Sequence, residues 1–345
     1  MISAGDFHTL VALRAKEGEV RAVEAVQEDR GVQPLLQYEV PKKSLDGQVE
    51  NIERIARKFH ALGRLIMVDA SALAAAPTFG GEQLGGLGSL ADRLSAAQWL
   101  DQFQDQIPFV PVASLDLAVN QLTWIGRLCA ELGAGGALRV GRAVGTGEVE
   151  SIVDALKLAP PDIDLIIDVG YLEYFTPQIA EAVSAALDAL RTVGSFRSMT
   201  LLSGSVPSIL DETALWERPR FEEVLWRAVV DGGGKDVRFG DYGVVHPGAT
   251  RSFRSHHVNV KYTCQDHWLL GRERMADSKA QAKTLGIVCR NLIESDSFSG
   301  PEFSWGDREI VSAASDGGTG NSLKSKPVAI GTSHHLAYLA SLNAA

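Results

Sequence analysis

The stretch Ile163-Asp164-Leu165-Ile166-Ile167-Asp168-Val169 is almost wholly apolar apart from its two aspartates, which is typical of a buried β-strand. A helical pattern follows it, with Thr176 as a suitable N-cap, Pro177 at the first helical position and an end near Thr192. A strand that is apolar on both faces and is followed by a helix is typical of a parallel sheet covered by helices. This strand–helix unit decides the fold class, because it recurs along the chain.

Seven other strands share this character, at residues 9–13, 32–40, 65–70, 108–115, 137–142, 198–203 and 237–245. Helical patterns follow each of the first seven strands, at residues 18–28, 49–59, 83–104, 117–132, 148–158, 177–192 and 220–230. Eight such units in roughly 250 residues match the size of a (β/α)8 barrel. The sequence therefore predicts an α/β fold of the TIM-barrel type. A doubly wound parallel sheet is the alternative, because alternation alone does not require the sheet to close.

The pattern changes after residue 245. A hairpin is expected at 258–263 and 267–270, a helix at 275–294 and a closing helix at 334–342, separated by a stretch rich in Gly, Ser and Asp. We predict a barrel body at residues 1–247. Residues 248–345 would complete and cap the barrel within one compact domain. In this scheme the helix at 275–294 covers the eighth strand, and the hairpin lies over the C-terminal ends of the strands.

Composition limits the classes of function. The net charge of −10 disfavours a general nucleic-acid coat, although it leaves room for a local basic site. No apolar run approaches the roughly 18 residues of a membrane span, and the first residues lack the pattern of a signal peptide. The three cysteines are widely spaced, which argues against a disulfide framework or a structural zinc site. We expect a cytoplasmic protein with no membrane contact.

The mouth of the predicted barrel is the expected place for chemistry, because catalytic groups of such barrels lie at the C-terminal ends of the strands. Charged side chains within barrel strands are costly unless they are paired. The candidate ligand-binding groups at these strand ends are Lys16, Glu39, Arg139 and Tyr242, and the candidate catalytic groups are Asp168, Asp241 and His246. A purely structural pair of Asp168 with Arg139 is the competing interpretation.

The last third of the chain adds a second group of candidates. It holds six of the eight histidines, and between Arg251 and Arg290 there are eight Lys or Arg against three Asp or Glu. With the stacking surfaces of Tyr262 and Trp268, this segment predicts contacts with phosphate or nucleic acid, whereas a solvated hairpin and a charged helix face are the alternative. The candidates here are His334 for catalysis and Lys261, Trp305 and His335 for ligand binding.

Metal binding has no clear motif. The chain lacks a His-Glu-x-x-His sequence and any Cys/His zinc pattern. The adjacent His334 and His335 would point about 100° apart on a helix and could not readily share one ion. The metal is therefore unassigned, and a divalent cation held by carboxylates at the mouth is the only cofactor we expect.

Several segments resemble the phage-named Beta protein family. They are Phe239-Gly240-Asp241-Tyr242-Gly243-Val244-Val245-His246-Pro247, Tyr262-Thr263 with Trp268, the stretch 298–307, Gly320-Asn321 and Ser333-His334-His335-Leu336. The opening, 10–21 followed by Gln33-Pro34-Leu35-Leu36, is also similar. The chain departs from the family pattern at Gln37, where an acidic residue is frequent, and at Leu323-Lys324-Ser325-Lys326, where an aromatic is frequent. The resemblance implies a phage-related or host-defence context and does not specify a reaction.

Three functional hypotheses follow. The first is a hydrolase of a phosphate-bearing or nucleic-acid substrate, with phosphate held by Lys16, Arg139 and Lys261, a cation or base supplied by Asp168, Asp241 or Glu39, and protons moved by His246 and His334. The second is a non-catalytic module that binds a nucleic acid or a protein partner in a phage-related or defence assembly. The third is a scaffold whose polar motifs join the C-terminal third to the barrel.

Overall fold

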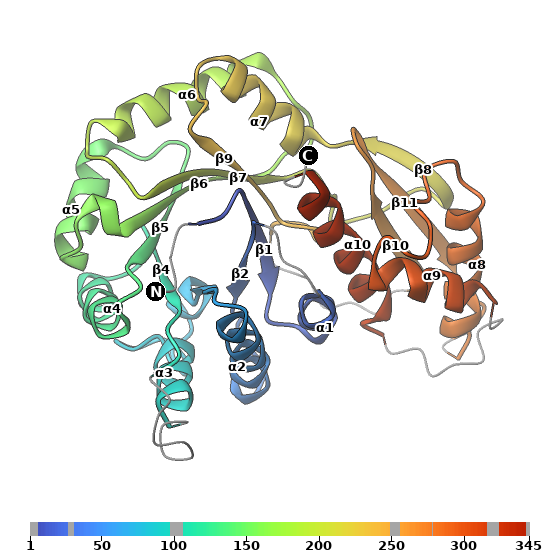
Figure 1. The fold of residues 1–345 in the computed structure, drawn as a ribbon, viewed down its shortest axis with the longest axis horizontal. Coiled ribbons are helices and arrows are strands. Elements are labelled where there is room, and N and C mark those ends of the chain that lie inside the picture. The colour runs from blue at the N-terminus through green and yellow to red at the C-terminus, as the bar shows by residue number, and fades with distance from the viewer. Residues whose placement is uncertain are drawn as a thin grey trace.

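The computed structural model describes residues 6–26, 31–96, 106–248, 256–277, 279–315 and 324–342. Eight parallel strands form a closed barrel in the order β1-β2-β3-β4-β5-β6-β7-β9 (Figure 1). The closed ring confirms the (β/α)8 prediction and excludes the doubly wound sheet. The barrel strands are β1 (Thr9–Arg14), β2 (Val32–Gln37), β3 (Met67–Asp69), β4 (Val110–Ser114), β5 (Gly136–Gly141), β6 (Ile163–Tyr171), β7 (Ser198–Gly204) and β9 (Val237–Asp241).

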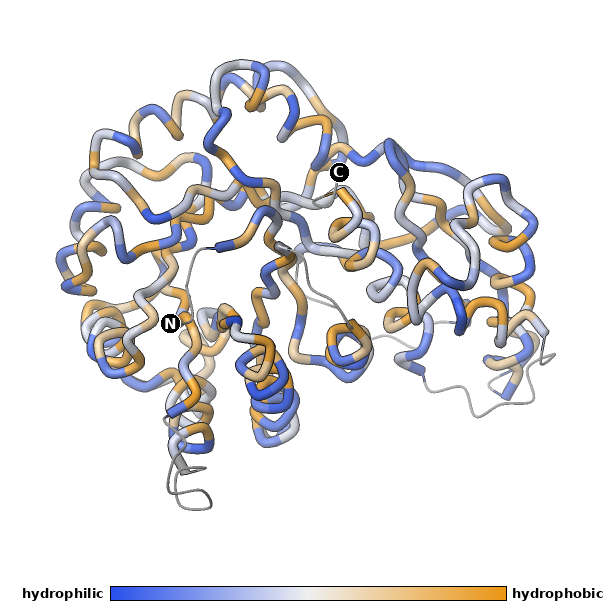
Figure 2. Tube along the Cα trace, in the orientation of Figure 1, coloured by the Kyte–Doolittle hydropathy of each residue, from blue (hydrophilic) through white to orange (hydrophobic). Residues whose placement is uncertain are grey.

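Helices surround this ring, and hydrophobic and hydrophilic residues alternate along them because one side of each helix faces the strands (Figure 2). In α2, for example, the apolar residues predicted at helical spacing are the buried ones, from Val49 to Phe59. The helices are α1 (Glu17–Ala25), α2 (Asp46–Ala61), α3 (Gly86–Ala96), α4 (Val119–Leu132), α5 (Thr146–Leu156), α6 (Pro177–Arg191) and α7 (Phe221–Asp231), with short 3-10 turns η1 (Ser71–Leu73) and η3 (Pro160–Asp162). The part of the predicted helix 83–104 beyond residue 96 lies outside the described residues.

A smaller module lies beside the barrel (Figure 1). Its antiparallel sheet has the order β10-β11-β8, with β10 (His257–Thr263), β11 (His267–Arg274) and β8 (Ala214–Pro219), and α8 (Gln281–Ile293) and α9 (Trp305–Ser315) pack near it. The hairpin was expected from the sequence, whereas β8 and α9 were not. The edge strand β8 buries little apolar surface, and α9 begins in a stretch rich in Gly and Ser, so neither element has a strong hydrophobic period.

Helix α10 (Lys326–Leu342) lies between the barrel and this module, and it packs against α1 on one side and β10 and α9 on the other. Its Leu336 and Leu339 belong to the barrel core. The prediction that the helix at 275–294 covers the barrel is therefore wrong, because α8 buries Leu285 and Val288 in the core of the smaller module instead. A helix enclosed by two cores is apolar on most sides, so its period alone does not reveal which surface it covers.

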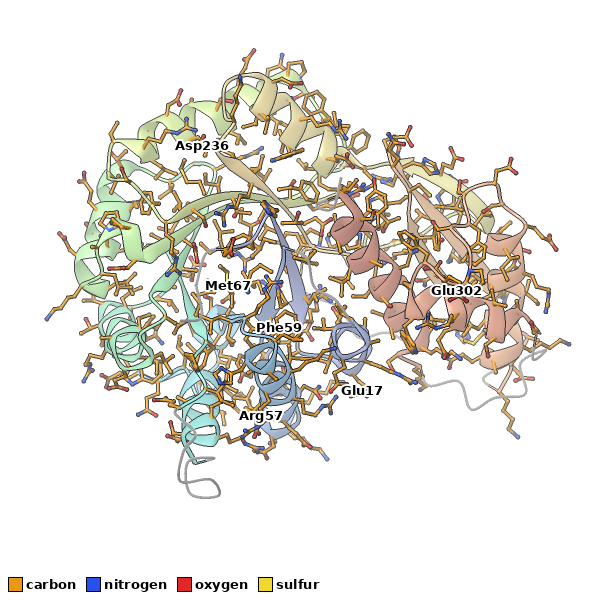
Figure 3. All side chains as sticks on the ribbon, in the orientation of Figure 1. Glu17, Arg57, Phe59, Met67, Asp236 and Glu302 are labelled. Atoms are coloured by element: carbon orange, nitrogen blue, oxygen red, sulfur yellow. The ribbon has the colours of Figure 1, made fainter. Side chains whose placement is uncertain are left out.

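The strand register sorts the side chains inside the barrel into layers. Residues paired across parallel strands point the same way, and alternate residues along a strand share a face. The middle layer is mostly apolar, and Met67 of this layer lies inside the ring of strands (Figure 3), together with Ala12, Leu35, Val112, Ala137 and Ile166, while Thr200 beside Ile166 is a polar member. The layer above it, at the C-terminal ends of the strands, is mainly polar and includes Arg14, Gln37, Asp69, Ser114, Arg139, Asp168 and Tyr242.

The crossing of α9 and α10 provides a test of this packing. A Cβ atom at Gly306 would lie 2.2 Å from the Ile330 carbonyl oxygen, so we expect Gly306→Ala to lower the free energy of unfolding by about 2 kcal/mol, measured by urea denaturation. Gly147→Ala is the matched control, because a Cβ there meets no atom within 4 Å. An equal effect of both substitutions would contradict the close approach of the two helices.

Candidate functional site

A cavity of about 750 Å³ opens at the C-terminal ends of the barrel strands. Residues of β1 to β6, of the segments that follow β2, β3 and β4, and of the loop after β9 line it, and none of its lining residues comes from β10 or β11. The polar groups that matter most here are Arg14, Glu39, Asp69, Ser114, Arg139 and Asp168. Glu39, Arg139 and Asp168 are candidates that the sequence placed at the mouth, and Arg14 and Asp69 also lie at strand ends, whereas Ser114 was not expected there.

Arg139 is the centre of this mouth. Its Nη1 donates to Asp69 Oδ2 at 2.6 Å, while its Nε and Nη2 donate to Asp168 Oδ2 at 2.9 and 2.7 Å. The Tyr242 hydroxyl donates to the same Asp168 oxygen at 2.7 Å and lies 3.0 Å from Arg139 Nη2. One guanidinium thus joins side chains from β3, β6 and the end of β9.

Local backbone structure holds the two carboxylates in place. Asp69 Oδ1 accepts the Ser71 amide at 2.8 Å, and Asp168 Oδ1 accepts the Gly170 amide at 2.8 Å. The second contact occurs at a bulge of β6, where Gly170 has a φ of 73°, a conformation that favours glycine. Both carboxylates are therefore oriented toward Arg139 by their own chain.

Burial and charge set the protonation of this cluster. Burial lowers the pKa of Arg139, but the charges of Asp69, Tyr242 and Asp168 outweigh it and the net shift is upward. Burial and the Asp168 carboxylate raise the pKa of Tyr242 well above its usual value. At physiological pH the mouth therefore holds a guanidinium and a protonated phenol, which can both donate hydrogen bonds.

Ser114 is the polar residue of the mouth that the sequence patterns missed. It pairs with Arg139 in the β4–β5 register, and its Oγ is buried without a hydrogen-bond partner among the described residues. A lone serine at the end of a strand has no motif, so only its position in the closed ring reveals it. A buried hydroxyl without a partner is costly, and a ligand oxygen in the cavity would satisfy it.

Arg14 holds the opposite side of the mouth. Its Nη2 donates to the carbonyl oxygens of His246 at 2.7 Å and Gly248 at 2.6 Å, so the loop after β9 is held over β1. Its Nε lies 3.3 Å from Glu39, whose other carboxylate oxygen is 2.6 Å from the Nζ of the exposed Lys16. The predicted ligand-binding residues Lys16 and Glu39 therefore form an ion pair at the rim.

Two titratable groups lie behind Arg14. Burial raises the pKa of Glu19 to about 7, although the backbone amide and the charge of Arg14 act in the opposite direction. Burial and the Arg14 charge lower the pKa of Lys261 to about 8, and its Nζ donates to the Val244 carbonyl at 2.8 Å. Lys261 does not line the mouth cavity, so it supports the loop after β9 from outside the cavity.

Asp241 and His335 meet outside the barrel, where both are buried. His335 Nε2 lies 3.0 Å from both carboxylate oxygens of Asp241, and its Nδ1 lies 2.8 Å from Thr263 Oγ1. Asp241 Oδ1 also accepts the Gly243 amide at 2.9 Å. The predicted catalytic Asp241 therefore connects the end of β9 to α10 and β10 and does not reach the mouth.

His334 forms a second buried pair. Its Nδ1 lies 2.9 Å from Asp307 Oδ2 and its Nε2 lies 2.9 Å from the Thr263 carbonyl oxygen, while its ring stacks on Tyr262 at 3.6 Å. Both ring nitrogens face oxygen atoms. The His334–Asp307 pair joins α9, α10 and β10 and is closed to solvent.

The predicted catalytic set is therefore not assembled as one site. Asp168 lies at the mouth, Asp241 and His334 lie in separate buried pairs, and His246 packs its ring 4.5 Å from Tyr171 with Nδ1 3.0 Å from the Val206 carbonyl. Trp305 borders a different cavity of about 200 Å³ between α1 and α10, beneath Arg21.

Trp268 is buried, and its Nε1 donates to Glu222 at 2.9 Å, so it offers no stacking surface. Residues 251–255 of the basic segment and the Gly320-Asn321 pair lie outside the described residues.

Within the described part of the chain there is no group of three His, Cys, Asp or Glu residues placed to hold a metal, and the divalent cation stays a prediction. None of the described helices combines the length and apolarity needed to cross a membrane.

Arg139→Leu tests the central ion-pair cluster. The substitution leaves Asp69, whose side chain is 3% exposed, and Asp168 without their cation, so we expect a loss of about 3 kcal/mol in the free energy of unfolding. Arg127→Leu is the matched control, because that arginine and its partner Glu82 are exposed. If urea denaturation of Arg139→Leu shows a loss below about 1 kcal/mol, water solvates the two carboxylates well enough to replace their interaction with the guanidinium.

Glu19→Gln tests the buried carboxyl by its pH dependence. Ionised Glu19 is unfavourable in the folded state, so its cost is absent below the unfolded pKa of about 4.5 and complete above pH 7. We expect the variant to be more stable than the wild type by about 3 kcal/mol at pH 8 and by less than about 1 kcal/mol at pH 5. The exposed neighbour Glu17→Gln should show no such trend, and a pH-independent difference for Glu19→Gln would contradict the burial effect.

Comparison with known proteins places the chain in a family. No curated protein matches it. Among solved structures, a fructose-bisphosphate aldolase from Campylobacter jejuni is similar with a TM-score of 0.38 and 11% identity, over 69% of this chain and 70% of the aldolase chain. That similarity is too low to support an argument about chemistry. The family model described as Beta protein matches residues 11–341, and because this range spans nearly the whole sequence, the chain belongs to the Beta protein family.

Proposed function

We propose that this protein binds a small phosphate-bearing substrate at the barrel mouth and hydrolyses it. The observation that supports this most is the change from an apolar middle layer to a polar upper layer beneath a cavity of about 750 Å³. Polar side chains inside a barrel are costly. At the lower end Asp164 is paired with Arg197 and Ser198, whereas the polar groups of the upper end border a cavity and include the Ser114 hydroxyl, which has no partner among the described residues. Their position at the C-terminal ends of the strands is where barrel enzymes bind substrate.

The distribution of charge supports an anionic group on one side of the mouth. Near β1 and β2, Arg14 and Lys16 face the single carboxylate of Glu39. Near β3 and β6, Arg139 faces the two carboxylates Asp69 and Asp168. A phosphate group is therefore favoured toward Arg14 and Lys16, and the carboxylates remain on the side where a water molecule would be activated.

In the proposed reaction, Arg139 divides its hydrogen bonds between Asp168 and the phosphate of the substrate. Asp168 accepts hydrogen bonds on both oxygens, so it becomes a base only when Arg139 turns part of its donors to the substrate phosphate. Water then attacks phosphorus and gives its proton to Asp168 while the bond to the leaving oxygen breaks. Asp168 finally returns that proton to the leaving oxygen. Tyr242 keeps its proton and positions Asp168 throughout.

A second candidate function is a non-catalytic binding module or scaffold in a phage-related or defence assembly. The saturation of Asp168 by Arg139, Tyr242 and the Gly170 amide favours it, as do the closed pairs of Asp241 and His334. Groups that are satisfied within the protein stabilise a fixed shape, whereas an enzyme needs at least one of them to exchange partners during turnover.

We expect slow hydrolysis of p-nitrophenyl phosphate or its bis(p-nitrophenyl) diester in the presence of Mg²⁺ or Mn²⁺. Asp168→Asn should lower kcat by about 100-fold or more, because it removes the base. Ser114→Ala should instead raise KM, because the hydroxyl contacts the ligand. The exposed carboxylate of Asp188 gives the matched control, and Asp188→Asn should leave both constants unchanged.

Binding without turnover separates the two candidate functions. If inorganic phosphate or AMP raises the melting temperature of the wild type but not of Arg14→Gln, and neither ester is hydrolysed, the mouth is a binding site and not a hydrolase. Absence of both effects would refute the mouth as a phosphate site.

A further inference from the structure

A cavity of about 200 Å³ lies where the barrel meets the smaller module. Its walls come from α1, β2 and α2 of the barrel, from α10, and from α9 with the segment before it (Figure 1). Its interior is mainly apolar and includes three aromatic rings, with contributions from Val23, Val32, Phe59, Phe303, Trp305 and Leu336. None of its lining residues borders the barrel mouth, so the two cavities are separate.

The hydroxyl groups in the wall of this cavity already bond within the protein. Ser304 Oγ donates to Asp307 Oδ2 at 2.6 Å and accepts the Asp307 amide at 3.1 Å. Ser333 Oγ accepts the Gly306 amide at 3.0 Å. An apolar group therefore fits the interior better than a polar one, because a polar group would exchange its bonds to water for apolar surroundings.

The volume of the cavity indicates the size of the group that it holds. An apolar cavity of roughly 150 Å³ can bind benzene, so a cavity of about 200 Å³ has room for one ring of that size. Aromatic side chains attract such a ring in offset or edge-to-face arrangements, and Phe59, Phe303 and Trp305 supply them. An empty cavity lacks dispersion contacts on one side of each lining residue, and a bound ring restores them.

Two residues of opposite charge stand at the opening of this cavity. Glu302 and Arg308 both line it, and both are exposed. Within the described part of the chain, neither forms an ion pair with the other or with a third residue. Arg21 adds a second guanidinium, whose Cζ lies 5.1 Å from the centre of the Trp305 ring. The opening thus offers an acceptor for an ammonium group and donors for a carboxylate.

We propose that this cavity binds an amino acid with one apolar aromatic ring, such as phenylalanine. The ring enters the cavity, the carboxylate pairs with Arg308 and the ammonium group pairs with Glu302. A simple aromatic acid would bring its carboxylate close to Glu302, and a simple aromatic amine would bring its charge close to two arginines. A ligand with both charges matches the opening better than either. The proposal does not depend on hydrolysis at the barrel mouth.

The test measures binding of L-phenylalanine to the full chain by isothermal titration calorimetry. We expect L-phenylalanine to bind about fivefold more tightly than phenylacetate or phenethylamine, each of which lacks one of the two charged groups. L-phenylalanine should also raise the melting temperature, because the unfolded chain has no such cavity.

Two substitutions at the opening separate the two charges. Arg308→Gln should weaken the binding of L-phenylalanine by about threefold to fivefold without weakening that of phenethylamine. Glu302→Gln should weaken the binding of L-phenylalanine by a similar factor without weakening that of phenylacetate. Arg127→Gln is the matched control, because this arginine is exposed on α4 and pairs with Glu82 far along the chain from the cavity residues.

A larger side chain in the wall tests the cavity itself. Ala337 and Ala340 of α10 line it, so Ala337→Leu should fill it and abolish binding of L-phenylalanine, and Ala340→Leu serves if the first variant does not fold. Ala185→Leu on the exposed side of α6 is the control, and circular dichroism checks each variant. The proposal is overturned if the wild type does not bind L-phenylalanine, if the filled variants bind it as well as the wild type, or if phenylacetate or phenethylamine binds equally tightly.

Discussion

The ion-pair cluster of Arg139 with Asp69 and Asp168 is the interaction on which the barrel mouth depends. It connects β3, β5 and β6, and Tyr242 extends it to β9, so one guanidinium links half of the ring at its upper end. The bulge at Gly170 and the turn after Asp69 aim the two carboxylates at it. Because this cluster replaces apolar packing, the upper end of the barrel is a polar cavity, whereas the middle is mostly packed with apolar side chains.

Helix α10 imposes the second constraint, since it belongs to the barrel and to the smaller module at once. Its leucines pack in the barrel core, and its adjacent histidines reach two different acids, Asp307 of α9 and Asp241 of β9. Two buried pairs on consecutive residues leave α10 little freedom to rotate, because each must keep its own partner. The smaller module is thereby held beside the barrel.

The barrel was readable from sequence because each strand–helix unit is local, and its apolar strands and helical periods survive in the final fold. The rule that substrates meet barrels at the strand ends also brought Arg139, Asp168 and Tyr242 to one place without any structure. The roles of residues in the last third of the chain were predicted less accurately. Asp241 and His334 were predicted to be catalytic and His335 to bind ligand, whereas the fold pairs His334 with Asp307 and His335 with Asp241 inside the protein.

The sequence by itself thus determined the alternation of strands and helices, the family resemblance and the polar character of the strand ends, because these follow from local periodicity and from motifs, whereas the closure of the sheet into a barrel came from the structure. Only the tertiary structure decided that α10 and not α8 covers the barrel, that Ser114 faces the cavity, and that Trp268 is buried while Trp216 is partly exposed. These outcomes depend on contacts between residues far apart in the chain. Polar groups take whichever partner burial leaves within reach, and no local pattern encodes that choice.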